Sequence, residues 1–252
     1  MNVQLDLGWM EAVLLCSVRL LVFFLLAPPF SSNSVPLRIK AMLGLGVALA
    51  VSPAVAPAYK STDVATLITS LVLEIVVGAV LGFLVMLIFA AVTSAGSMID
   101  LFGGFQLAQA FDPLSMLNGA QFTRLFQMTA LALLFASDGY QLVIGGMVRS
   151  FTALPLGGGM AMGAPVQALV SATTQMFLAA VQIAGPLLVV LFLADVGLGL
   201  LTRVAPGLNA FGLSFPLKIF LTLSLAGIAF TVLPRIVAAL AGQAFSSLGG
   251  AR

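Results

Sequence analysis

Three ionisable residues, Arg19, Glu74 and Asp195, lie inside long apolar runs of the sequence. An ionisable group at membrane depth is costly, so such a side chain usually faces the protein interior, where it is paired or wetted. Two kinds of chemistry fit this pattern. The side chains could form structural ion pairs or subunit contacts, or they could relay protons or ions. We favour the first kind and predict assembly or structural roles for all three residues.

Residue types that enzymes and metal sites commonly use are scarce. The sequence has no histidine, its single cysteine is Cys16 within an apolar run, and no zinc-protease, serine-hydrolase or P-loop motif occurs. Cys16 is best explained as a small buried hydrophobe, so neither a disulfide nor a thiolate metal site is expected. We therefore predict a protein without enzymatic activity and without a cofactor.

The composition is that of an integral membrane protein. Of 252 residues, 61% are hydrophobic and only 7% are charged, and the mean hydropathy is +1.19. The net charge is +2, without a basic tract or stripe, which disfavours a nucleic-acid partner. A soluble fold is excluded on the same grounds.

The apolar runs predict long helices, because a hydrocarbon core needs about 20 mostly apolar residues per helix. Residues 93–124 separate two of these runs and are richer in glycine and polar residues. Pro28 and Pro29 end the first run, Pro186 predicts a kink or a hairpin, and Pro216 and Pro234 bracket the last run. We predict a single all-α membrane domain over residues 1–252, with some runs broken into hairpins by Pro or Gly. The six runs are residues 7–27, 37–55, 65–92, 124–148, 166–201 and 213–240.

Gly78 and Gly82 follow Glu74 at intervals of four residues. This spacing places both glycines on one face of a helix, where the missing side chains let a second backbone approach closely. By itself the pattern predicts close helix packing. The glycines at 96, 103 and 104 are different, because they lie in or beside the predicted interruption, where we expect them to act as hinges.

Several patterns together resemble the R subunit of the bacterial flagellar protein-export gate. They include Arg19 with Val35-Pro36-Leu37-Arg38, Glu74 with its two glycines, the turn Phe111-Asp112-Pro113, and Asp138-Gly139. The most specific pattern is a C-terminal block, which contains Asp195, Arg203, Pro206, Asn209, Phe211, Pro216 and Lys218. The order and spacing of these patterns extend the resemblance over nearly the whole chain.

The resemblance implies a specific assembly. Members of the family are single copies that join five P-type and four Q-type subunits in a helical, pore-forming complex, alongside the B-type and A-type membrane proteins of the export apparatus. The complex lies at the centre of the flagellar basal body in the bacterial inner membrane and passes unfolded flagellar proteins. Much of it is raised out of the bilayer plane, so apolar runs in this family need not be straight membrane spans.

The resemblance also implies that the middle loop is a plug in the lumen of the pore. Bulky aromatic side chains that some relatives carry in this loop correspond to Leu107 and Ala110 here, whereas this chain has Phe105 and Phe111. An aspartate followed by proline can fix the far end of such a loop as a turn. The predicted plug residues are Gly103, Gly104, Phe105, Leu107, Ala110, Phe111, Asp112 and Pro113.

Two alternatives to the flagellar export gate stay open. The first is the equivalent subunit of a virulence-type injection apparatus, which shares the fold and the lumen. The second is an autonomous small-solute transporter, in which broken helices lie near the substrate site. For the C-terminal block we predict an assembly role, and the alternative there is an interfacial loop with snorkelling basic side chains.

Overall fold

The computed structural model describes residues 7–32, 34–60, 63–105, 121–158, 163–205, 207 and 210–248. Of these, residues 163–165, 210–211 and 240–248 are described by their backbone alone. The described part of the chain consists of helices and short connections and contains no strand. The predicted all-α fold is therefore confirmed.

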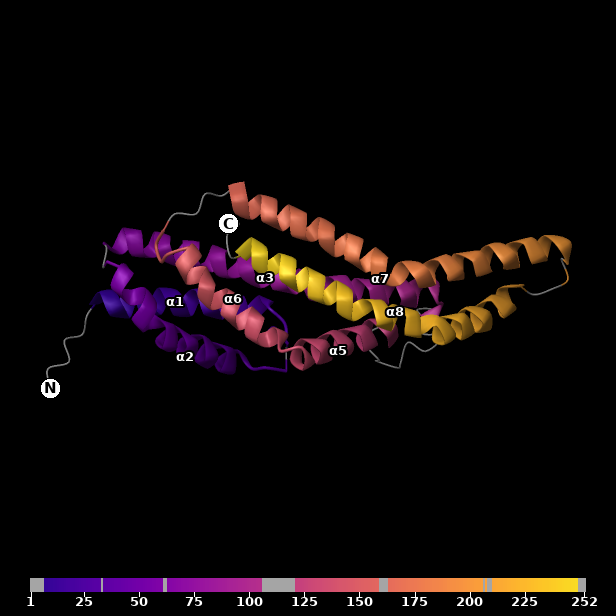
Figure 1. The fold of residues 1–252 in the computed structure, drawn as a ribbon, viewed down its shortest axis with the longest axis horizontal. Coiled ribbons are helices and arrows are strands. Elements are labelled where there is room, and N and C mark those ends of the chain that lie inside the picture. The colour runs from indigo at the N-terminus through magenta and orange to yellow at the C-terminus, as the bar shows by residue number, and fades with distance from the viewer. Residues whose placement is uncertain are drawn as a thin grey trace. The chain divides into compact units, whose positions relative to one another are not determined.

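The helices follow the predicted runs closely at the N-terminus and diverge later (Figure 1). The run predicted at 124–148 is two helices, because Asp138 adopts a left-handed backbone with φ of 53° and the chain restarts as a helix at Gly139. The helices are α1 (Leu7–Leu26), α2 (Leu37–Val55), the short 3₁₀ helix η1 (Ala56–Ala58), α3 (Val64–Phe102), α5 (Gln121–Ala136), α6 (Gly139–Ala153), α7 (Gly163–Val204) and α8 (Ala210–Leu248).

Proline interrupts the helices less than the sequence predicts. Of the two outcomes predicted for Pro186, the hairpin is wrong, because α7 continues through this residue. The ribbon of α7 does bend part-way along its length (Figure 1). Pro216 and Pro234 both lie inside α8 instead of bracketing it. A long helix tolerates the loss of one backbone hydrogen bond when the remaining turns and the surroundings hold it together. The prediction for Pro28 and Pro29 agrees with the structure, since α1 ends at Leu26.

Helix α3 extends ten residues beyond its predicted end, to Phe102 instead of residue 92. The predicted interruption between the helices, residues 93–124, is therefore too long at both ends. It begins after Phe102, and it ends where α5 begins at Gln121. Gly96 and Asp100 in this extension do not break the helix, because both are packed against the start of α5. Residues 106–120 lie outside the described part of the chain.

Five of the described helices are long and apolar enough to cross a membrane, or six if α5 and α6 together count as one span. Helices α1, α2, α3, α7 and α8 contain these spans. The protein is an all-α integral membrane protein, as its composition predicts.

The chain divides into two compact units, which we describe separately. Unit 1 contains Met1–Leu87, Ser137–Thr173 and Ala241–Arg252, and unit 2 contains Ile88–Ala136 and Thr174–Leu240. Unit 1 therefore holds α1, α2, the first part of α3, and α6. Unit 2 holds the last part of α3, α5, and most of α7 and α8.

In unit 1, α1 packs against both α2 and the first part of α3. A Cβ atom at Gly78 would lie 2.5 Å from the carbonyl oxygen of Arg19, and one at Gly82 would lie 2.9 Å from Cβ of Leu26. No side chain fits at such distances, so both glycines are needed for the approach of α3 to α1. The predicted close packing at these glycines is what the structure contains.

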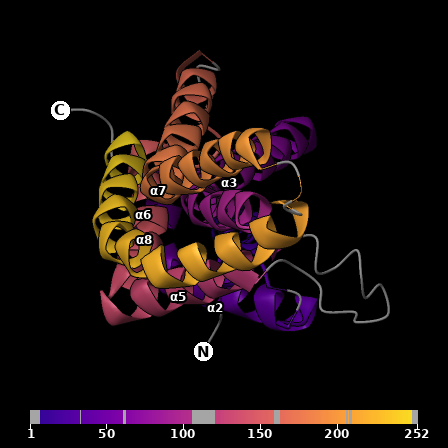
Figure 2. The ribbon, with the colours of Figure 1, turned by 90° about the vertical axis from the view of Figure 1, so that its right-hand side faces the viewer.

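In unit 2, the second half of α7 and the first half of α8 form a helical hairpin (Figures 1 and 2). One ion pair connects them, from Nζ of Lys218 to Oδ1 of Asp195 at 2.7 Å. The end of α3 and the start of α5 form a second contact region in this unit. It carries the two ends of the loop that the sequence singles out.

Candidate functional site

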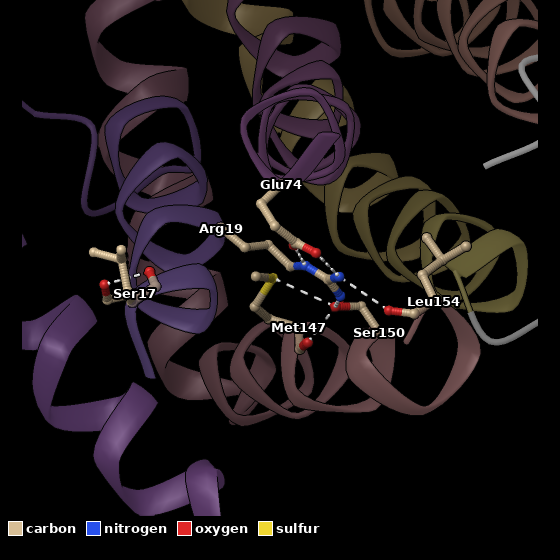
Figure 3. Close-up of polar contacts among 7 residues, drawn as sticks. Ser17, Arg19, Glu74, Met147, Ser150 and Leu154 are labelled. Atoms are coloured by element: carbon tan, nitrogen blue, oxygen red, sulfur yellow. Dashed lines mark hydrogen bonds and ion pairs between the residues drawn. The ribbon is translucent and has the colours of Figure 1, made fainter. Parts of the chain in front are cut away.

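The most deeply buried charged group of unit 1 is the pair formed by Arg19 of α1 and Glu74 of α3 (Figure 3). Their side chains are 1% and 2% exposed. Nε of Arg19 donates to Oε2 of Glu74, and Nη2 donates to Oε1 at 3.0 Å, so the contact is bidentate. Two parallel N–H···O bonds to a carboxylate give both strength and fixed geometry.

The guanidinium of Arg19 also binds α6 and the residue that follows it (Figure 3). Nη1 donates to Oγ of Ser150 at 3.3 Å, and Nη2 donates to the carbonyl oxygen of Leu154 at 2.9 Å. The ring of Phe151 lies under the guanidinium, with its centroid 4.3 Å from Cζ. Because Arg19, Glu74 and these α6 groups come from three different helices, one side chain ties α1, α3 and α6 together.

The surroundings of this cluster are those of a structural ion pair. Among the described residues no buried side-chain nitrogen or oxygen lacks a hydrogen-bond partner. The hydroxyl of Ser150 in turn donates a hydrogen bond to the carbonyl oxygen of Met147 at 2.6 Å, so the network ends on the backbone of α6. The described contacts of Arg19 and Glu74 are all with protein groups, as expected for a structural ion pair.

The third ionisable residue of the sequence prediction, Asp195, has a different environment. Its partner is Lys218, and the two side chains are 42% and 16% exposed, respectively. Both side chains are more exposed than Arg19 and Glu74, so the loss of one leaves the other less isolated than in a fully buried pair. Asp195 and Lys218 therefore differ from Arg19 and Glu74 in what their loss would cost.

In unit 2 a single carboxylate joins the two ends of the middle loop. Asp100, near the end of α3, is fully buried. Its Oδ1 accepts from the backbone N–H of Phe122 at 2.9 Å, and its Oδ2 accepts from the backbone N–H and the hydroxyl of Thr123 at 2.7 and 2.8 Å. The first N–H groups of a helix have no partner within the helix, so Asp100 caps α5 from another helix.

Glycine allows the two helices to come this close. A Cβ at Gly96 would lie 2.7 Å from Cα of Thr123, and one at Gly103 would lie 2.7 Å from the carbonyl oxygen of Ile99 and 2.8 Å from Oγ1 of Thr222. Gly104 adopts a φ of +82°, the left-handed region in which glycine is strongly favoured. The prediction that Gly96 acts as a hinge is therefore wrong, because this residue lies inside α3 in close contact with α5.

Aromatic side chains fill the space beside the Asp100 cap. Phe105 contacts Phe122 edge to face, with 5.2 Å between ring centroids, and Phe126 contacts Phe122 at 6.4 Å and Phe230 of α8 at 5.1 Å. Such pairs add to the free energy of burial. We call the region formed by Gly96, Asp100, Gly103, Gly104, Phe105, Phe122 and Thr123 the loop base.

With this geometry described, comparison with known proteins identifies the family. The model of a family described as "Bacterial export proteins, family 1" matches residues 10–244. The chain belongs to this family. The resemblance drawn from the sequence motifs is thereby confirmed, and both the Arg19–Glu74 cluster and the loop base lie within the matched part of this export protein.

Known relatives of this export protein are of two kinds. It is 32% identical to the flagellar biosynthetic protein FliR of Escherichia coli over 84% of its length and 82% of the relative. It is 29% identical to FliR of Bacillus subtilis over 87% of its length and 85% of the relative. The Yop proteins translocation protein T of Yersinia pestis is 30% identical, but over only 54% of this chain and 53% of the relative.

The structure places the predicted site residues of this export protein unevenly. Arg19, Glu74, Gly78 and Gly82 meet in one contact, and Gly103, Gly104 and Phe105 meet in the loop base. Arg203 is exposed near the end of α7, and Phe211 is described by its backbone alone. Leu107, Ala110, Phe111, Asp112, Pro113, Pro206 and Asn209 lie outside the described residues.

Two residues that these contacts depend on, Asp100 and Ser150, were not among the predicted site residues. The sequence does contain an indication for Asp100, because it is a carboxylate between two apolar stretches. We expected a loop at this position, so the sequence did not predict that Asp100 caps a helix. Ser150 carries no signal of its own, because serine is common in membrane helices. No group of three or more residues suited to hold a metal ion occurs within the described ranges.

Replacing Glu74 with alanine should leave Arg19 buried without its carboxylate. We expect a loss of about 3–5 kcal/mol in the free energy of unfolding, measured by denaturant titration of the purified protein in detergent. The matched control is Asp195→Ala in the less buried pair of Asp195 and Lys218, for which a smaller loss is expected. Glu74→Gln keeps hydrogen-bond acceptance, so unchanged stability with abolished transport in that variant would contradict a structural role.

Replacing Asp100 with alanine should free the start of α5. Three hydrogen bonds to a charged acceptor are lost together, so we expect a loss of roughly 2–4 kcal/mol in the free energy of unfolding. The amides of Phe122 and Thr123 should then exchange hydrogen faster, as measured by hydrogen-exchange mass spectrometry. Thr123→Val removes only the hydroxyl and serves as the control, with about 1 kcal/mol expected. Equal effects of the two variants would refute the cap.

Proposed function

We propose that this protein is a pore-forming and gating subunit of the bacterial flagellar type III export apparatus, through which unfolded flagellar proteins cross the inner membrane. The observation that carries the proposal is the extent of similarity. The match to FliR covers 84% of this chain and 82% of the relative, whereas the match to translocation protein T covers about half of each. The flagellar function therefore fits better than the injection apparatus.

The proposal includes the assembly that the family resemblance implies. One copy of this chain joins five P-type and four Q-type subunits, with the B-type and A-type proteins beside them, at the centre of the basal body. In this assembly the chain acts as one export-gate domain and catalyses no reaction. Exposed Arg203 and the partly exposed pair of Asp195 and Lys218 support contacts with neighbouring subunits, because these groups need polar partners inside a membrane complex.

We also propose that the middle loop closes the lumen as a plug. Phe105, Leu107 and Phe111 supply apolar bulk in the sequence, and a soft apolar closure seals against ions while admitting side chains of any chemistry. The loop base supports this role, since Asp100 and the close contacts of Gly96 and Gly103 hold both ends of the loop in fixed positions. Glycine 104 and Phe105 belong to the base, so a test of the plug must leave them intact.

The subunit role is tested by expressing the chain with its genomic neighbours and measuring the mass of the purified particle by native mass spectrometry. We expect several copies of two smaller hydrophobic proteins for each copy of this chain. Arg203→Ala should reduce the copurified neighbours, whereas Arg149→Ala, also at an exposed position, should not. A particle that contains this chain alone, with the neighbours well expressed, would favour an autonomous small-solute transporter. Deleting the gene then distinguishes the flagellar export apparatus from the injection apparatus, since loss of flagella supports the flagellar function.

The plug is tested by deleting residues 107–110 in the assembled complex. We expect the complex to form with its normal mass and to leak small ions when reconstituted in vesicles, because the apolar closure is shortened while the loop base is kept. The control is the same measurement on the unaltered complex, in which the loop and the loop base are both intact and no leak is expected. Unchanged ion permeability in a correctly assembled deletion variant would overturn the plug.

A further inference from the structure

Lys40 is a buried lysine near the start of α2. The residue is only 6% exposed, and it lies on the buried face of the helix with Gly44, Ala48 and Ser52, at intervals of four residues. This face packs on α1, since a Cβ at Gly44 would lie 3.4 Å from the backbone nitrogen of Leu21. The apolar stem of Lys40 is therefore inside the protein.

The ammonium group of Lys40 has no counterion within the described ranges. No hydrogen bond or ion pair between described residues involves its Nζ atom. In the same part of the chain no buried side-chain nitrogen lacks a hydrogen-bond partner, so Nζ reaches the protein surface. A cation at the end of a buried stem is stable there only if water or an external anion meets it.

The charged end of Lys40 lies toward the start of α2. Each Cα–Cβ bond of a helix tilts toward the helix N-terminus, so a long side chain covers the turn before its own position. Helix α2 begins at Leu37, and Lys40 is its fourth residue. The turn that Lys40 covers is therefore the first turn of the helix.

The first turn of α2 has unused backbone donors. The N–H groups of Ile39 and Lys40 both donate to the carbonyl oxygen of Pro36, at 3.0 and 3.3 Å. The N–H groups of Leu37 and Arg38 have no acceptor among the described residues, and no side chain caps the helix. Both residues are exposed, and the first turn contains no acidic residue. Two cationic side chains and the positive end of the helix dipole thus meet at one accessible place.

We propose that the start of α2 binds a phosphate group. The backbone N–H groups of Leu37 and Arg38, the guanidinium of Arg38 and the ammonium of Lys40 are its ligands. A phosphate group fits because its oxygens accept from several donors at once, and helix N-termini combined with lysine and arginine are typical phosphate sites. The inference does not depend on the proposed export function.

Two sources supply such a phosphate group. One is the headgroup of an anionic lipid, because α2 belongs to a segment of membrane length, Leu37–Ala58, and basic pockets between membrane helices bind lipid phosphates. The other is free phosphate, which reaches the site where this end of α2 lies outside the bilayer. The ligands in the protein are the same in both cases, so the experiment has one series for each source.

The lipid series uses the complete chain, purified with its neighbours in a mild detergent, and counts lipid adducts by native mass spectrometry. Phosphatidylglycerol, which has a net negative headgroup, is compared with phosphatidylcholine, whose headgroup is neutral overall. The variants are Lys40→Met, which keeps a long apolar stem without the ammonium, and Arg38→Gln. The matched control is Lys60→Met, which removes an exposed lysine beyond the other end of α2.

The phosphate series uses the same proteins without added lipid. It measures the rise in Tm that sodium phosphate causes relative to sodium chloride at equal ionic strength. Phosphate also stabilises proteins through exclusion from their surface, so only the difference between the unaltered protein and each variant reports on the site.

We expect Lys40→Met to weaken binding about tenfold, Arg38→Gln to weaken it as well, and Lys60→Met to leave it unchanged. Weakening in the lipid series alone identifies a lipid headgroup, and weakening in the phosphate series alone identifies free phosphate; either result supports the site. Equal binding by the unaltered protein and Lys40→Met in both series would overturn it. A carbodiimide cross-link between Lys40 and a carboxylate of a neighbouring subunit would also overturn it, because the ammonium would then be paired with protein. If Lys40→Met does not assemble, Arg38→Gln decides by the same criteria, since Arg38 is exposed.

Discussion

The bidentate contact between Arg19 and Glu74 is the constraint on which unit 1 depends. Two opposite charges can be buried together only where their geometry is good and their remaining hydrogen-bonding groups are satisfied. Both conditions require α1, α3 and α6 to meet at one point, since Ser150 and the carbonyl of Leu154 complete the shell of Arg19. Gly78 and Gly82 make this possible by removing the side chains that would hold α1 and α3 apart.

Unit 2 uses a carboxylate in a different way. The described contacts of Asp100 are not with a cation, since its carboxylate accepts hydrogen bonds from two backbone amides and a hydroxyl at the start of a helix, where the peptide dipoles favour negative charge. Glycine is again the means of approach, at Gly96. Each unit therefore contains a buried acidic side chain beside a close contact at glycine. In unit 1 the carboxylate of Glu74 binds the side chain of Arg19, whereas in unit 2 the carboxylate of Asp100 binds the first backbone amides of α5.

Much of the fold could be predicted from the sequence, because apolar length and the glycine spacing are local signals. The bounds of α2 agree with the prediction, and the cost of burying charge singled out Arg19 and Glu74. What could not be predicted depends on contacts between distant segments. Gly96 and Asp100 look like loop residues until Thr123 is known to lie against them. Likewise, nothing near Pro186 or Pro216 in the sequence indicates that the surrounding helix continues.

The separation of the ion-pair partners along the chain has a consequence for synthesis. Glu74 follows Arg19 by 55 residues and Ser150 follows it by 131, and a growing chain leaves the ribosome from its N-terminus. Arg19 is therefore made before the groups that bind it, and a cation at membrane depth without a partner costs about 2.5–3.5 kcal/mol on the insertion scale. The rest of α1 is strongly apolar and offsets that cost. Its guanidinium reaches its final coordination only when α6 has been made, so α1 is synthesised well before the contacts that fix it in place.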